Sequence, residues 1–247
     1  MSREAIQVDG LTVAFGDFVA IKDLSLIASY GEVHGVIGPN GAGKTTLLDV
    51  ITGKSRPRAG HVWLDHDTSL AEMSEHDIAR AGVGRKFQKP SIFENLAVYN
   101  NLEMAMRDDR SWGRRLVEGI TETQDNRIRE VLKTIGLEAE ASRLAGHLAH
   151  GQRQWLEIGM LLMQEPRVLM LDEPVAGMSD EETEQTAELV DRLRSDTRAI
   201  LVIEHDMDFV ERVADRVTVL NEGSTLFEGS MAAARQDPKV IDVYLGR

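Results

Sequence analysis

The sequence predicts an α/β fold built around a parallel sheet. Two segments that are typical of buried strands, at 32–37 and 168–171, support this prediction. The first leads into a glycine-rich loop and the second into two acidic residues, as is typical of buried parallel strands that end at one edge of a sheet. Between about residues 95 and 164, apolar residues recur at helical spacing instead. We therefore expect one domain over residues 1–247, with an α/β core at 1–88 and 166–247 and a mainly α-helical lobe at 89–165.

The chain opens with a predicted antiparallel β subdomain, because residues 6–15 and 19–26 mostly alternate between apolar and polar side chains. A turn at Gly16-Asp17 joins these strands. A helix from Lys44 to Thr52 is expected to stop at Gly53. The other expected elements are a helix between Ser74 and Gly82, a strand at 83–87, a helix at 152–163, a helix that begins with acids at 180–182, a strand at 199–204 and a final helix at 241–247.

Composition excludes several function classes. The 28 basic and 41 acidic residues give a net charge of −13, which argues against nucleic acid or an anionic lipid surface as the main partner. The absence of cysteine excludes disulfides and thiolate metal sites. The N-terminus lacks the apolar region of a secretory signal, and no apolar run approaches the ~20 residues of a membrane-spanning helix. We expect a cytoplasmic chain that reaches the membrane only through a protein partner.

A complete phosphate-binding loop lies between a predicted strand and a predicted helix. Its glycines allow backbone N–H groups to turn toward one anion, and the helix that follows directs its positive end to the same point. Lys44 is expected to contact the β- and γ-phosphates, Thr45 to bind Mg²⁺, and Thr46 to contact the α-phosphate. The pattern G-x-x-x-x-G-K-[ST] is formed by Gly38, Pro39, Asn40, Gly41, Ala42, Gly43, Lys44 and Thr45.

Three further polar residues follow predicted strands at the same sheet edge. Asp172 and Glu173 come directly after the strand at 168–171, and His205 comes after the strand at 199–204. Since ligands of such folds bind at the carboxyl ends of the strands, we expect all three near the phosphates. Asp172 is expected to orient Mg²⁺, Glu173 to activate the attacking water as general base, and His205 to contact the γ-phosphate.

Leu148-Ala149-His150-Gly151-Gln152 connects these motifs to a known family, because its Gly151 lies 21 residues before Asp172 (172 − 151 = 21). Together with the phosphate loop, Gln88 and His205, this segment resembles the signature of ATP-binding cassette (ABC) ATPases, which drive membrane transporters. The resemblance covers nearly the whole chain. It implies ATP and Mg²⁺ as cofactors and a P-loop NTPase fold of the ABC type.

The resemblance also implies roles that the residues alone do not establish. Gln88 matches the family's glutamine loop, which couples Mg²⁺ and water to movement of the lobe. His205 matches the switch histidine. Phe15 matches the aromatic residue that stacks on adenine, although a core position in the first sheet is an alternative. The segment at 149–152 is expected to cap the γ-phosphate held by a second cassette, in a head-to-tail dimer.

Two parts of the chain depart from the family pattern. In the signature segment, Ala149 replaces the usual serine and His150 replaces a glycine, so the hydroxyl that contacts the γ-phosphate is missing. Ser179 stands where the loop after the acidic strand usually carries aspartate. A cassette that binds ATP but hydrolyses it poorly is therefore one alternative function.

At the level of the subfamily, three segments resemble the urea-type importers of the branched-chain amino-acid group, namely 87–96, 154–161 and 172–178. The expected function is the ATPase of an importer for a small polar solute, most specifically urea. Alternatives are the ATPase of a branched-chain amino-acid or amide importer and a soluble nucleotide-gated clamp. The expected partners are transmembrane permease subunits at the cytoplasmic face of the inner membrane, a second cassette (itself or a paralogue) and, indirectly, an external solute-binding protein.

Overall fold

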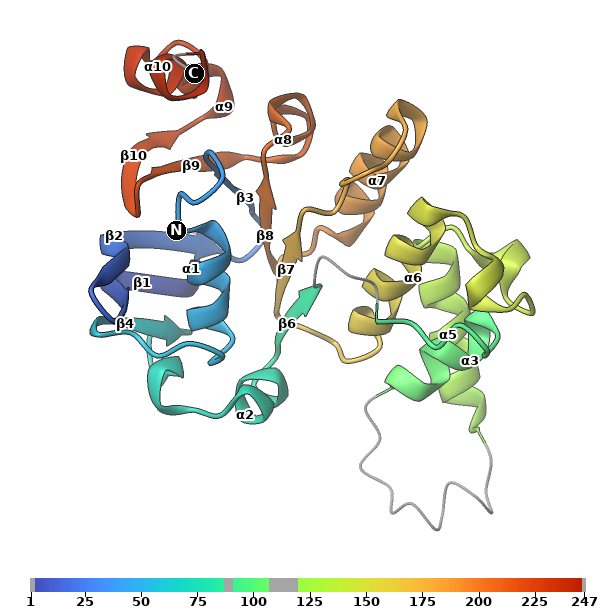
Figure 1. Ribbon diagram of the computed structural model, residues 1–247. Coiled ribbons are helices and arrows are strands. Elements are labelled where there is room, and N and C mark those ends of the chain that lie inside the picture. Colours follow the sequence, from blue (N-terminus) through green and yellow to red (C-terminus); the bar gives the residue numbers. More distant parts are fainter. Residues whose placement is uncertain (1–2, 87–90, 107–119, 246–247) are drawn as a thin grey trace. The chain divides into compact units, whose positions relative to one another are not determined.

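The computed structural model describes residues 3–86, 91–106 and 120–245 (Figure 1). These residues form two compact units. The core unit comprises Met1–Arg85, Pro166–Pro174 and Arg194–Arg247, and the helical unit comprises Lys86–Glu165 and Val175–Leu193.

The core unit holds a six-stranded sheet with the order β10-β9-β3-β8-β7-β6. Its central strands β3, β7 and β8 are buried along their whole length, and β3 pairs in parallel with both β8 and β9. In register, Ile37 at the end of β3 lies opposite Glu204, and Asp172 lies opposite Ile203. The carboxyl ends of three strands therefore meet at one edge. The strands are β3 (Val33–Ile37), β6 (Val83–Lys86), β7 (Val168–Asp172), β8 (Ala199–Glu204), β9 (Arg216–Asn221) and β10 (Ser224–Gly229).

The antiparallel subdomain is a second sheet with the order β2-β1-β4-β5. The predicted hairpin at Gly16-Asp17 is confirmed, with Phe15 paired to Phe18 across the turn. Both strands are longer than expected, because their ends pair as well, as Glu4 does with Ser29. The strands are β1 (Glu4–Phe15), β2 (Phe18–Ser29), β4 (Ala59–Leu64) and β5 (Thr68–Ser69).

Two helices of the core unit, α1 and α2, lie where the sequence predicts, whereas the final helix α10 begins at Pro238, three residues before the predicted 241. Helix α1 (Lys44–Ile51) stops before Gly53, whose φ of +78° is accessible mainly to glycine. Helix α2 (Glu75–Arg80) is capped by Ser74, whose side chain accepts a hydrogen bond from the N–H of Asp77. The C-terminal helices are α8 (Met207–Val213), α9 (Met231–Ala234) and α10 (Pro238–Leu245).

The helical unit is formed by α3 (Val98–Ala105), α5 (Glu122–Thr134), α6 (His150–Leu162) and α7 (Asp180–Leu193). Helix α5 contacts the other three, and its expected apolar face of Ile128, Val131 and Leu132 is buried. Gly159 permits close helix packing, since a Cβ there would lie 2.6 Å from Ile135 Cδ1. Helix α6 begins at His150, two residues earlier than predicted.

The division of the chain between the two units differs from the sequence prediction. Residues 175–193 were assigned to the core, but they group with the helical unit because α7 packs against α5. The indole N–H of Trp155 on α6 also donates to Thr186 Oγ1 on α7, at 2.9 Å. Within the described residues, no helix is both long and apolar enough to cross a membrane.

Candidate nucleotide site and signature segment

The phosphate loop between β3 and α1 adopts a backbone that requires glycine. Gly38, Gly41 and Gly43 have φ values of +153°, +81° and +103°. A Cβ at Gly38 would lie 2.2 Å from the carbonyl oxygen of Leu220, whereas Gly41 faces open space. Helix α1 begins directly after Gly43, so its first N–H groups lie at the loop. The local structure is therefore that of an anion-binding loop.

Lys44 extends its side chain across the loop. Its Nζ donates to the carbonyl oxygens of Gly38, at 2.6 Å, and Pro39, at 3.0 Å. Burial lowers the pKa of Lys44, and the carboxylates at the ends of β7 and β8 oppose this shift. Thr45 is exposed and Thr46 is half-buried, and both belong to the first turn of α1, directly after the loop. A cation and two hydroxyls thus line one loop, a donor set that fits a nucleotide's phosphates.

Asp172 ends β7 and is buried, with 1% of its surface exposed. Its Oδ2 accepts a hydrogen bond from Arg85 Nη2 at 2.8 Å. Its Oδ1 is buried and has no hydrogen-bond partner among the described residues. An uncompensated carboxylate oxygen fits a site for Mg²⁺ or for a water bound to it, because this ion takes one or two carboxylates together with phosphate oxygens.

Glu173 has a backbone conformation that is uncommon for a side chain larger than glycine. Its φ is +47°, and its N–H donates to the carbonyl oxygen of Ile203 at 2.9 Å. About a quarter of the carboxylate side chain is exposed (26%). Strained backbones of this kind often occur at functional sites, where surrounding contacts hold them in place. Here the strain directs Glu173 out of the buried strand.

His205 lies beside Glu173 at the same sheet edge. Its Nδ1 is 4.0 Å from Glu173 Oε1 and 3.6 Å from Glu204 Oε2, and 60% of its side chain is exposed. The His205 N–H also donates to the fully buried Glu204. The structure thus brings together Asp172, Glu173 and His205 at adjacent strand ends, as the sequence predicts.

The structure describes Phe15 but not Gln88, the two remaining residues of the predicted site. The ring of Phe15 ends β1 with 54% of its surface exposed, so the alternative of a core position is wrong. An exposed ring is free to stack on a base, and that role stays a prediction. Gln88 lies outside the described residues, and its expected role likewise stays a prediction.

The signature segment forms the N-terminus of α6. Ala149 is the N-cap residue, and its N–H donates to the side chain of Gln152 at 3.0 Å. Alanine offers no oxygen in return, so only half of a capping box is present. The N–H of Gly151 donates to Glu182 Oε1 at 3.2 Å, and His150 Nε2 lies 3.1 Å from the carbonyl oxygen of Ala176. One of the expected phosphate donors is therefore already engaged by a carboxylate.

Glu182 also forms two hydrogen bonds with Ser179, the residue that departs from the family's aspartate. The Ser179 hydroxyl accepts from the Glu182 N–H at 3.3 Å, and Glu182 Oε2 accepts from the Ser179 N–H at 3.0 Å. This reciprocal pair is a capping box at the start of α7. The hydrogen bond from Ser179, together with that from Gly151, lowers the pKa of Glu182. Ser179 thus retains a capping role despite its departure from aspartate.

Three residues with contacts around these motifs were not predicted from the sequence. Arg85 binds Asp172, Glu182 binds the signature segment, and Glu157 is a buried carboxylate on α6. For Arg85, a signal existed, since it lies inside the predicted strand at 83–87, and an arginine in a strand that becomes buried needs an acidic partner. For Glu182 and Glu157 no such signal existed, because their contacts depend on how distant segments pack in the folded chain.

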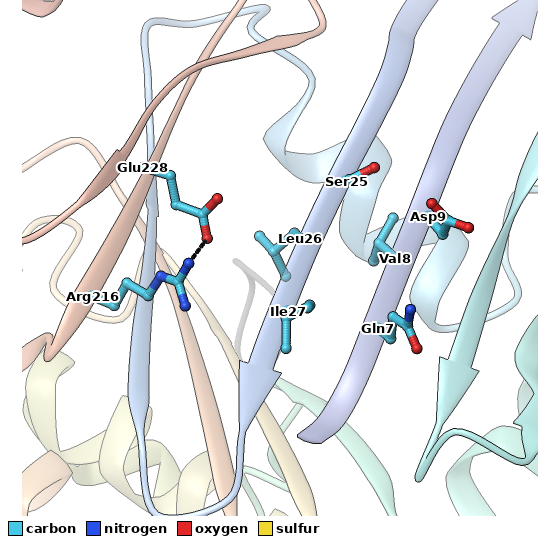
Figure 2. Close-up of a pocket in the computed structure, with 8 residues that line it drawn as sticks. All are labelled: Gln7, Val8, Asp9, Ser25, Leu26, Ile27, Arg216 and Glu228. Carbon is cyan, nitrogen blue, oxygen red and sulfur yellow. Dashed lines mark ion pairs between the residues drawn. The ribbon is translucent and has the colours of Figure 1, made fainter. Parts of the chain in front are cut away.

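A separate pocket of about 200 Å³ lies between the strands β1 and β2 and the strands β9 and β10 (Figure 2). An ion pair joins Arg216 and Glu228 along one of its sides. The pocket shares no residue with the phosphate loop or with the ends of β7 and β8. We assign it no function.

The fold and the site together define a nucleotide-binding protein with a phosphate loop. Comparison with known proteins identifies the family, since residues 21–176 match the ABC transporter family. BraF of Pseudomonas aeruginosa, a high-affinity branched-chain amino acid transport ATP-binding protein, is 38% identical over 100% of this chain and 99% of its own length. LivG of Escherichia coli, with the same description, is 37% identical over the same shares. The chain belongs to the ABC transporter family.

Solved structures agree with this assignment. An ATP-binding cassette of an ABC transporter in its ADP conformation superimposes with a TM-score of 0.86 at 29% identity, covering 99% of both chains. A nucleotide-free cassette gives a TM-score of 0.84 at 27% identity, covering 99% of this chain and all of that one. The fold is that of an ABC ATPase cassette, and the chain is an ATP-binding ATPase subunit.

Proposed function

We propose that this chain powers an importer for a small polar solute of the branched-chain amino-acid and amide group. The observation that carries the proposal is the cluster at one sheet edge, where Lys44 interacts with the carboxylates that end β7 and β8. Similarity to transport ATP-binding proteins over the whole chain supports it. In this proposal, ATP hydrolysis in the cassette drives movement of the permease.

Each residue of the phosphate loop has a proposed role. The backbone from Gly38 to Gly43 binds the phosphates, and Lys44 leaves its carbonyl partners to contact the β- and γ-phosphates. Thr46 contacts the α-phosphate. Thr45 and Asp172, through the unpartnered Oδ1, would hold Mg²⁺. When bound, this cation would supply positive charge that favours displacement at the γ-phosphate.

Glu173 is the proposed general base. Its partly exposed carboxylate is directed out of the strand by the positive φ, which suits the removal of a proton from the attacking water. His205, 4.0 Å away, orients that water and the γ-phosphate. Gln88 adds a contact to the cation and water, and Phe15 stacks on the adenine.

A second cassette completes the proposed site. Its signature segment, Ala149 to Gln152, caps the γ-phosphate through backbone N–H groups at the start of α6. Since Glu182 engages the N–H of Gly151, this carboxylate must release the N–H before a phosphate can bind there. Together with the missing hydroxyl at Ala149, that contact favours a slow cassette as the alternative function. The partner cassette is a second copy or a paralogue.

The transported solute is the finer part of the proposal. The relatives BraF and LivG are described as branched-chain amino acid transport proteins, and this favours a branched-chain amino acid. Urea, the narrower sequence-based prediction, has no support among the relatives named here and stays a prediction. The proposed partners are permease subunits and an external solute-binding protein, which would hold the chain at the cytoplasmic face of the inner membrane.

The proposal is tested by uptake in cells that carry the whole transporter. With wild-type chain, we expect uptake of labelled leucine or isoleucine, and none with a Lys44→Met variant, which keeps the length of the side chain but loses its charge. Uptake of labelled urea is measured in parallel. If the cells take up urea but neither amino acid, the proposed solute is wrong and urea takes its place. If uptake with Lys44→Met equals that of wild type, ATP hydrolysis by this chain does not power the importer.

A further inference from the structure

Arg85 joins the helix after the phosphate loop to the acidic end of β7. It lies on β6, and only 4% of its side chain is exposed. Its Nη1 donates to Asp49 Oδ1 at 2.6 Å, and its Nη2 donates to Asp172 Oδ2 at 2.8 Å. Asp49 lies on α1, and Asp172 is the proposed Mg²⁺ residue. One guanidinium therefore spans two elements that must keep their relative position during nucleotide binding.

The chemistry of this contact depends on arginine. A guanidinium is planar and can donate to two carboxylates from one rigid fork, whereas a lysine ammonium is a single point charge on a flexible stem. The pair with Asp172 is almost fully buried on both sides, with side-chain exposures of 4% and 2%. Buried ion pairs contribute little net stability compared with apolar residues of similar size. Stability alone therefore accounts poorly for a charge at this position.

The contact also selects between the two oxygens of Asp172. Oδ2 is occupied by Arg85, while Oδ1 is buried and has no hydrogen-bond partner among the described residues. A carboxylate held by one oxygen cannot rotate freely about its χ2 angle. Arg85 thus fixes which oxygen remains available.

We propose that Arg85 is a positioning residue that orients Asp172 Oδ1 toward the cation of the bound nucleotide and ties this carboxylate to α1 through Asp49. The inference rests on the proposed function, since it assigns Mg²⁺ to Asp172. Arg85 itself touches neither nucleotide nor cation in this proposal. Its effect is on the affinity for the cation.

The test measures how nucleotide binding depends on free Mg²⁺, with a fluorescent ATP analogue as the probe. Arg85→Lys keeps the charge but loses the fork. We expect it to bind the analogue in EDTA within twofold of wild type, and to need at least tenfold more free Mg²⁺ for half of the Mg²⁺-dependent increase in affinity. Asp49→Asn, which leaves the Asp172 contact in place, is expected to show a smaller shift of about threefold.

A matched control comes from Lys54, an exposed residue whose Nζ lies 3.6 Å from the same Asp49 oxygen. Lys54→Gln removes a charge next to Asp49 without altering Arg85, and its Mg²⁺ midpoint should equal that of wild type. Thermal unfolding, measured for all variants, separates stability from cation affinity.

Three outcomes would overturn the inference. One is an Arg85→Lys variant that unfolds at lower temperature but keeps the wild-type Mg²⁺ midpoint, which would leave Arg85 a purely structural role. Another is an equal loss of binding with and without Mg²⁺. If Arg85→Lys does not fold, an Asp49→Asn variant with an unchanged midpoint would also overturn it. Failure of wild-type chain to bind nucleotide would instead refute the proposed function.

Discussion

Glu157 allows a quantitative test of how much the burial of an ionised carboxylate destabilises the helical unit. This residue lies on α6 and is 5% exposed. Its Oε1 accepts a hydrogen bond from the N–H of Ser91 at 3.2 Å, and its Oε2 lies 4.0 Å from Lys86 Nζ. Burial raises the pKa of Glu157 to about 7, against opposing contributions from Lys86 and the Ser91 N–H.

The sign of the pH effect follows from this raised pKa. Below about pH 4.5, the ordinary value for a glutamate, the carboxyl group is protonated in both folded and unfolded chains. Between pH 4.5 and 7, only the unfolded chain ionises, so the folded state loses stability as the pH rises. Above pH 7 the penalty is constant. The shift corresponds to about 3 kcal/mol, and we expect about 1–2 kcal/mol because proteins relax around buried charges.

The perturbation is Glu157→Gln, which removes the ionisation and keeps an oxygen for the Ser91 N–H. Unfolding by urea, followed by tryptophan fluorescence, gives the free energy of unfolding at pH 5, 6, 7 and 8. At pH 8 the variant should be more stable than wild type by about 1–2 kcal/mol, and this difference should shrink steadily as the pH falls from 7 toward 4.5. Glu138→Gln, at an exposed position, controls for the loss of one negative charge.

Two results would refute this reasoning. A difference between Glu157→Gln and wild type that is constant from pH 5 to pH 8 would mean that the carboxyl group does not titrate in this range. A wild type that is more stable than the variant at pH 8 would mean that the ion pair with Lys86 outweighs the cost of burial.

Three further predictions concern the loop, the lobe and the signature segment. Gly38→Ala should lower the free energy of unfolding by about 3 kcal/mol or more, because its Cβ would lie 2.2 Å from a backbone oxygen. Gly41→Ala places its Cβ in open space and should lower it by about 1 kcal/mol. Urea unfolding compares the two variants. Phe93→Asp, at a ring that is 48% exposed, should spare ATP binding and abolish solute uptake by the whole transporter; survival of both uptake and membrane association would exclude docking through Phe93. Ala149→Ser should tighten the ATP-dependent dimer and raise phosphate release, because a hydroxyl bonded to phosphate contributes roughly 1.5–3 kcal/mol; identical values alone and in the whole transporter would make the hydroxyl irrelevant.

Much of the fold could be predicted because its signals are local. The buried strand β3 leads directly into the glycine-rich loop, and the apolar run of β7 leads directly into Asp172 and Glu173. The glycines of the phosphate loop also mark their own conformations, as the positive φ values of Gly38, Gly41 and Gly43 confirm. Since parallel strands end at one edge, the grouping of Asp172, Glu173 and His205 followed from the same pattern.

The contacts between distant segments could not be predicted in this way. Arg85 meets Asp49 and Asp172 at sequence separations of 36 and 87 residues, and no periodicity records such a meeting. Glu182 looked like one of several acids at the start of α7, yet it bonds to Gly151, 31 residues earlier. The assignment of residues 175–193 to the core failed for a related reason, because the packing of α7 depends on its partner α5.

The measurement that tests the central claim most directly is phosphate release by wild type and by Glu173→Gln, with ATP binding and dimer formation followed in parallel. We expect Mg²⁺-dependent phosphate release by wild type, and a loss of at least about 100-fold in the variant, because a general base typically contributes that much or more. ATP binding should persist, and an ATP-bound dimer should accumulate. Glu72→Gln, at an exposed position of the core unit, should behave as wild type. Unchanged phosphate release by Glu173→Gln would contradict the assignment of this carboxylate as the base and, with it, the account of the site.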